Sequence, residues 1–131
     1  MTRTLLAATD FSAPARHALE RAAMLAQAHP DARLTLAHVV SGSALDTLRR
    51  MLPGNAATIE AQLLAQAETN LNELATNLAA HHPCSIDTVL AQGSALSVLS
   101  ELIETRKIDL LVMGVRGTHF VRELLLGATT E

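Results

Sequence analysis

Short apolar runs alternate with longer segments of helical periodicity, and this alternation limits the folds that the chain can adopt. The apolar runs cover residues 4–9, 34–40, 85–91 and 108–113. Apolar residues recur at helical spacing over residues 13–28, 59–80 and 95–103. Apolar strands joined by helices form a parallel sheet that is covered on both faces. We therefore predict an α/β fold with an open, mostly parallel sheet and helices on both faces.

Local signals mark where these elements begin and end. Ser12 is a predicted N-cap, Pro14 suits a first helical turn, and Pro30 follows the end of the same helix. Ser94 is the predicted N-cap of the helix over residues 95–103. Two glycines and a proline lie within residues 41–58, which predicts a loop with room for a short helix over 44–52.

Composition narrows the class of protein. A length of 131 residues predicts one domain over residues 1–131, and a hydrophobic content of 49% is typical of a globular chain. The net charge is −3 and the only aromatic residues are Phe11 and Phe120, so we expect no nucleic-acid partner and no membrane partner. A single cysteine, Cys84, and the absence of a secretory apolar run at the N-terminus predict a cytoplasmic protein.

Parallel sheets of this kind bind ligands beyond the carboxyl ends of their strands, where the strand order reverses. Asp10, Val39 and Gly114 stand at or just after such ends. Two residues separate Gly114 from Gly117, and nine separate Gly117 from Gly127. Glycines let backbone N–H groups approach a phosphate, and a helix that starts after Gly127 would add positive potential. The alternative is that these are ordinary loop glycines.

The glycine spacing resembles the G-x2-G-x9-G-[S/T] motif of the universal stress protein family, in its nucleotide-binding branch. The similarity extends to the segments LLAATDFSAPARHALERAAMLA, LTLAHVV, IDLLVMGVRG and LLLGATTE, and so to nearly the whole chain. The resemblance implies a Rossmann-like fold of the adenine nucleotide alpha hydrolase-like type. It also implies an adenine nucleotide as ligand, namely ATP with or without Mg²⁺, and a homodimer.

The same resemblance assigns roles to individual residues. Asp10 would accept a hydrogen bond from the exocyclic amine of adenine, and Val39 would contact the base through its backbone. Met113 and Gly114 would lie near the sugar. The phosphates would be held by the later residues of the motif: Gly117, Gly127, Ala128 and Thr129. Apart from the resemblance, the position of Arg116 within the glycine segment predicts that it adds positive charge near a phosphate.

Three departures from the family pattern affect these expectations. Ala128 replaces the motif's Ser or Thr, so one phosphate donor is missing, although Thr129 follows directly. Ala8, a further candidate site residue, stands where many members have proline or valine, and we expect a small effect. The family continues into a helix and a fifth strand beyond the position of Glu131, so we expect a longer chain to supply both.

Several side chains carry a second interpretation. Asp10 could cap a turn with Ser12, a role that is compatible with ligand binding. His38 lies in a predicted buried strand and is expected to be a core histidine with a hydrogen-bond partner. His81, His82 and Cys84 are metal-ligating types, but their spacing matches no structural zinc site, which favours a helix end leading into a loop.

Three functions are compatible with these features. The first is a regulatory stress-response protein that binds ATP. The second is a member of the same family that binds no nucleotide and acts through protein contacts, which Ala128 favours. The third is an ATP-hydrolysing or adenylating enzyme; the sequence opposes it because no glycine follows the first strand and no Walker lysine is present. We expect no catalytic residue and no protein-bound metal.

Overall fold

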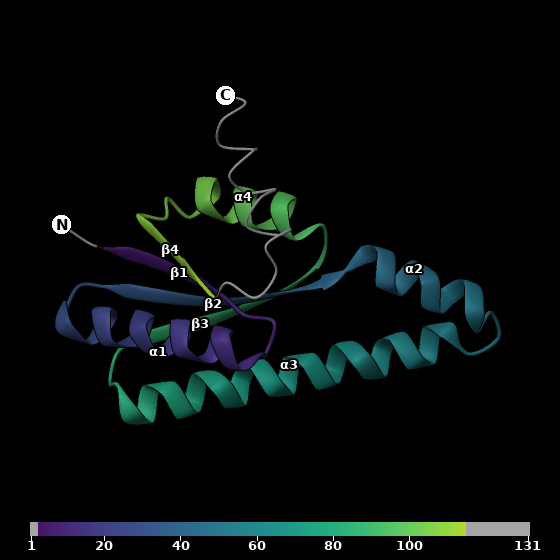
Figure 1. Cartoon of the computed structure of the whole chain (residues 1–131), viewed down its shortest axis with the longest axis horizontal. Coiled ribbons are helices and arrows are strands. Elements are labelled where there is room, and N and C mark those ends of the chain that lie inside the picture. Colours follow the sequence, from purple (N-terminus) through teal and green to yellow (C-terminus); the bar gives the residue numbers. More distant parts are fainter. Residues whose placement is uncertain (1–2, 115–131) are drawn as a thin grey trace.

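The computed structural model describes residues 3–114, and its elements alternate as the apolar pattern predicts (Figure 1). In chain order they are β1 (Thr4–Ala8), α1 (Ala13–Ala28), β2 (Arg33–Ser41), α2 (Gly42–Met51), α3 (Ala56–His81), β3 (Ser85–Gly93), α4 (Ala95–Thr105) and β4 (Leu110–Met113).

The strands of this range form one sheet in the order β3-β2-β1-β4, and every pairing is parallel. β1 is central: Leu5 pairs with Leu34 of β2 on one side and with Leu110 of β4 on the other. The chain moves outward from β1 to β3 and then crosses back to β4. The strand order therefore reverses between β1 and β4, and their carboxyl ends border the crevice where such sheets bind ligands.

Helices cover both faces of the sheet, as predicted. α1 and α3 lie on one face and α4 on the other (Figure 1). Side chains alternate along β1, so Leu5 and Ala7 pack in the core under α1 and α3, while Leu6 packs against Leu99 of α4. The core consists of leucine and alanine at nearly every fully buried position.

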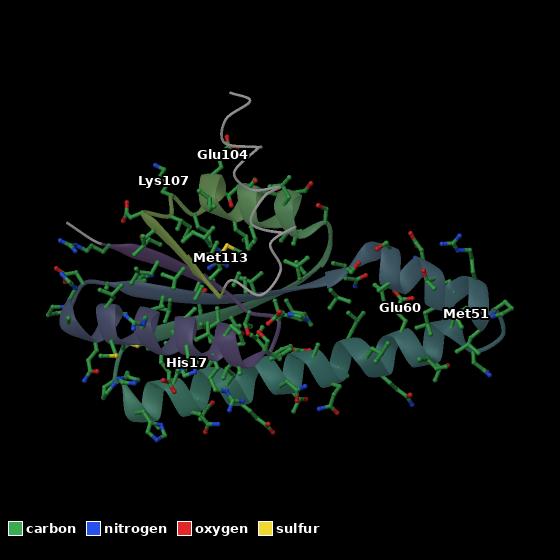
Figure 2. All side chains as sticks on the ribbon, viewed as in Figure 1. His17, Met51, Glu60, Glu104, Lys107 and Met113 are labelled. Atoms are coloured by element: carbon green, nitrogen blue, oxygen red, sulfur yellow. The ribbon has the colours of Figure 1, made fainter. Side chains whose placement is uncertain are left out.

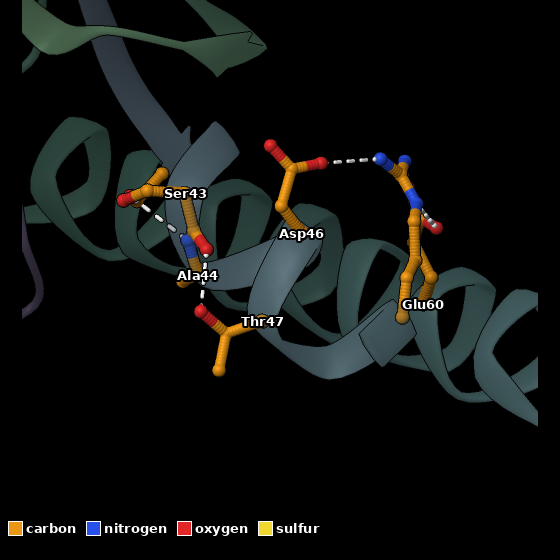
Figure 3. A network of polar contacts seen from close by, with 7 residues as sticks. Ser43, Ala44, Asp46, Thr47 and Glu60 are labelled. Atoms are coloured by element: carbon orange, nitrogen blue, oxygen red, sulfur yellow. Dashed lines mark hydrogen bonds and ion pairs between the residues drawn. The ribbon is translucent and has the colours of Figure 1, made fainter. Parts of the chain in front are cut away.

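Residues 41–58 were predicted as a loop with room for a short helix over 44–52. That helix forms as α2, whereas the loop is shorter than predicted because α3 already begins at Ala56. β2 continues to Ser41, whose Oγ accepts a hydrogen bond from the Ala44 N–H at 3.3 Å and so caps α2. Arg49 ties α2 to α3 through Nη2, 2.7 Å from Glu60 Oε1, and its Nη1 lies 2.9 Å from Asp46 Oδ1 (Figure 3). Only residues 52–55 remain between the two helices, and they contain Pro53 and Gly54, two of the turn signals in this segment.

Two N-caps predicted from the sequence are confirmed. Ser12 Oγ accepts from the Ala15 N–H at 3.3 Å, and Ser94 Oγ accepts from the Ser97 N–H at 3.5 Å. These serines fix where α1 and α4 begin. Both helices consequently start at the end of the sheet where β1 and β4 finish.

Candidate functional site

A cavity of about 530 Å³ lies at the carboxyl ends of β1, β2 and β4, beside the start of α4. That volume lies within the range of roughly 300–1,000 Å³ that small-molecule sites occupy. Its walls are mainly apolar, and its described lining residues are Ala8, Thr9, Asp10, Ala15, Ala37, His38, Val39, Ala95, Leu99, Met113 and Gly114.

The cavity brings together the candidate residues that come from three different strand ends. They are Ala8, Asp10, Val39, Met113 and Gly114. Figure 2 shows Met113 on the face of the sheet that α4 covers. The other candidates, Arg116, Gly117, Gly127, Ala128 and Thr129, lie outside the described residues.

Asp10 stands in the short connection from β1 to α1. Its Oδ1 accepts a hydrogen bond from the Ser12 N–H at 2.9 Å, so the turn-capping interpretation is confirmed. The side chain is exposed at the cavity wall, and a carboxylate oxygen accepts more than one hydrogen bond. Capping the turn therefore leaves Asp10 chemically able to accept from a ligand.

Gly114 follows β4 and meets the first turn of α1. A Cβ atom at this position would lie 2.5 Å from the backbone N of Ala15 and 2.5 Å from the backbone carbon of Pro14. Real Cβ atoms are not found that close to backbone, so a side chain would force β4 and α1 apart. Close packing of two elements at the cavity wall is thus a physical reason for the glycine.

His38 is half-buried in β2 and has a hydrogen-bond partner, as predicted. Its Nδ1 lies 2.7 Å from the carbonyl oxygen of Thr9, and its ring packs on Phe11 with centroids 4.5 Å apart. His38 also lines the cavity, which was not predicted. The available signal was its place next to Val39, near the carboxyl end of β2.

Three further lining residues were missed because they belong to helices. Ala15 lies in the first turn of α1, Ala95 begins α4, and Leu99 lies one turn later. The N-caps Ser12 and Ser94 mark both helix starts, but the sequence does not show that the two starts converge. A helix N-terminus carries partial positive charge, so the cavity has two sources of positive potential from backbone.

The segment from His81 to Cys84 is a helix end that leads into β3, as predicted. His81 Nδ1 donates to the Asn77 carbonyl oxygen at 2.8 Å, and His82 Nδ1 lies 3.3 Å from Gln27 Oε1. Burial raises the pKa of the Cys84 thiol, because the thiolate is poorly solvated there. Within residues 3–114, no three histidine, cysteine or acidic side chains gather as metal ligands.

The fold and the cavity define a parallel α/β protein with a ligand-sized site at its topological switch point. The family model of the universal stress protein family matches residues 1–131, so the chain belongs to that family. Comparison with curated protein sequences gave no match. In the part of the chain that the structure describes, no helix has both the length and the apolar character needed to cross a membrane.

Solved structures share this fold. A universal stress protein family member from Burkholderia pseudomallei superposes with a TM-score of 0.73 at 20% identity, covering 95% of this chain and 89% of that one. UspA from Lactobacillus plantarum gives a TM-score of 0.67 at 27% identity, with 88% and 79% covered. A universal stress protein in complex with cAMP gives 0.60 at 25% identity, with 84% and 70% covered.

Proposed function

We propose that this chain is an ATP-binding regulatory protein of the stress response and that it binds the nucleotide in the cavity. One observation carries the proposal. Residues that were assigned to an adenine nucleotide from the sequence, on three separate strand ends, line a single cavity of about 530 Å³: Ala8, Asp10, Val39, Met113 and Gly114.

The cavity suits the two chemically different ends of a nucleotide. Its apolar wall, which includes Ala37 and Leu99, suits the faces of a purine ring, and Asp10 supplies an acceptor for an exocyclic amine. The N-termini of α1 and α4 favour negative charge. In this proposal Gly117, Gly127 and the N–H groups of Ala128 and Thr129 hold the phosphates, with Arg116 nearby.

The universal stress protein that was solved with cAMP supports an adenine nucleotide as the class of ligand. We propose ATP as the ligand of this chain, with Mg²⁺ accompanying the phosphates. We further propose a single domain over residues 1–131, a cytoplasmic location and a homodimer. For the homodimer, the support within residues 3–114 is that β4 forms one edge of the sheet with Leu110 45% exposed.

Isothermal titration calorimetry tests the ligand. The purified protein is titrated with ATP, ADP, AMP and cAMP, each with and without Mg²⁺. We expect ATP to bind and Asp10→Ala to weaken it, while Asp31→Ala, an exposed carboxylate outside the cavity, leaves it unchanged. Light scattering on the same samples gives the number of chains per particle.

Ala128 favours a second function, a family member that works through protein contacts alone. It removes a hydroxyl that would otherwise donate to a phosphate. The calorimetry separates the two functions: heat of binding for none of the four nucleotides would leave only the protein-contact function.

A further inference from the structure

His38 bridges β2 and the connection that carries Asp10. Its Nδ1 lies 2.7 Å from the Thr9 carbonyl oxygen, although the two residues are 29 positions apart. A carbonyl oxygen only accepts hydrogen bonds, so Nδ1 carries the proton and donates it. Thr9 is the residue directly before Asp10 and is only 6% exposed. The histidine therefore supplies the partner of a main-chain carbonyl at a buried position.

The other neighbour of Asp10 also contacts His38. Phe11 has a φ of 65°, in the left-handed region that non-glycine residues rarely adopt. Such a conformation persists only where the surroundings hold it. Two contacts do so here: the Phe11 N–H donates to Thr9 Oγ1 at 3.0 Å, and the Phe11 ring lies against the His38 ring with centroids 4.5 Å apart.

Asp10 is thus placed between two residues that His38 holds. We propose that His38 is a positioning residue, which fixes the Asp10 carboxylate at the cavity wall through its bond to Thr9 and its contact with Phe11. The inference rests on the proposed function, in which Asp10 accepts from the adenine amine. His38 then acts on base selection through Asp10, in addition to its own place in the cavity wall.

An apolar side chain at position 38 would fill the same space but would leave the Thr9 carbonyl without its donor. The Thr9 N–H already bonds to the Ala37 carbonyl oxygen at 2.9 Å, so Thr9 is tied to β2 at both its N–H and its C=O. Without the hydrogen bond to the Thr9 carbonyl oxygen, the segment from β1 to α1 can rotate about the remaining bond at the Thr9 N–H. The predicted effect is misplacement of Asp10 while β1 stays paired with β2.

Two substitutions separate the donor from the bulk of the side chain. His38→Asn keeps an N–H donor at the place of Nδ1, whereas His38→Gln moves the donor to the place of Nε2. The readout is the ratio of affinities for ATP and ITP, because ITP has a carbonyl where ATP has the amine. Calorimetry gives both affinities, and circular dichroism gives the melting temperature of each variant.

We expect His38→Asn to keep the ATP preference of the parent. His38→Gln should lose about tenfold in ATP affinity with little change for ITP, as expected for one misplaced hydrogen bond to a charged group. An unchanged ATP/ITP ratio in His38→Gln would overturn the inference while the proposed function stands. A parent that binds neither nucleotide would overturn the proposed function, and this inference with it.

Nitrogen-15 NMR of the parent protein gives a second test. It needs no substitution, so its result does not depend on whether a variant folds. The proposal requires a proton on Nδ1 of His38, because that nitrogen faces the Thr9 carbonyl oxygen. An Nδ1 shift typical of a protonated nitrogen, before and after addition of ATP, is the expected result. A ring with the proton on Nε2 alone would exclude the bond to Thr9 and would overturn the assignment.

Discussion

Gly114 ends β4 at the point where that strand meets the first turn of α1. Its backbone approaches Pro14 and Ala15 so closely that hydrogen is the only side chain that fits. Packing within the protein therefore requires glycine at position 114. This requirement is compatible with the proposed place of Gly114 beside the sugar. A single residue thus serves the core and the cavity at once, which makes it a direct test of the local geometry.

Gly114→Ala should lower the free energy of unfolding by about 2 kcal/mol, the usual range of overpacking being roughly 1–3 kcal/mol. Gly54→Ala is the matched control, because no atom lies within 4 Å of a Cβ at that position. Urea unfolding followed by circular dichroism measures both. Equal stability of the two variants would show that β4 and α1 do not pack as described.

Ala128→Ser restores the hydroxyl that the family motif supplies at this position. We expect tighter ATP binding by about tenfold, since a hydrogen bond to a charged group contributes roughly 1.5–3 kcal/mol. Adenosine has no phosphate and should bind as it does to the parent, which makes it the control ligand. A gain of the same size for adenosine would remove position 128 from the phosphate site.

At the scale of elements, hydrophobic patterning predicted the strands and three of the helices, because burial sets their periodicity. The short helix that the sequence allowed over residues 44–52 forms as α2, but its tie from Arg49 to Glu60 was not predicted, since it depends on a partner in α3. The residues that line the cavity likewise divide into those that the sequence predicted and those that it did not. Asp10, Val39 and Gly114 follow from strand ends, whereas Ala15 and Ala95 depend on how helices pack, which periodicity does not specify.

Ser94→Ala should cost about 1 kcal/mol of stability, because the Ser97 N–H loses its acceptor at the start of α4. Ser100→Ala changes the same residue type at an exposed position inside that helix, and it should be neutral or slightly stabilising. Thermal unfolding of both variants gives the comparison. An equal effect at the two positions would mean that the cap contributes nothing measurable.

At the scale of the molecule, the proposed site draws on β1, β2, β4 and the starts of α1 and α4, so it exists only in the folded protein. A ligand that binds the native state alone stabilises it, by about 2.7 kcal/mol at a concentration 100 times its dissociation constant. Binding and global stability are therefore coupled in this chain.

ATP should accordingly raise the melting temperature of the parent, and Gly117→Val should lose that rise because a side chain there blocks approach of the backbone to a phosphate. Ala61→Val, at an exposed position of α3 outside the cavity, is the control and should keep the rise. Differential scanning fluorimetry without and with ATP measures the shift. A full shift in Gly117→Val would exclude this glycine from the phosphate site.

The pairing of β1 with β4 also means that the sheet can be completed only late in the synthesis of the chain. Thr4 and Asp109, which are 105 positions apart, are joined where the Thr4 N–H donates to Asp109 Oδ2 at 2.9 Å. During synthesis β1 emerges first and its partner β4 last among the described strands, whereas β2, the other partner of β1, follows β1 directly in the sequence. Contacts over such separations form slowly because a long loop must close first. A nascent chain therefore has no complete cavity until β4 has left the ribosome and docked against β1.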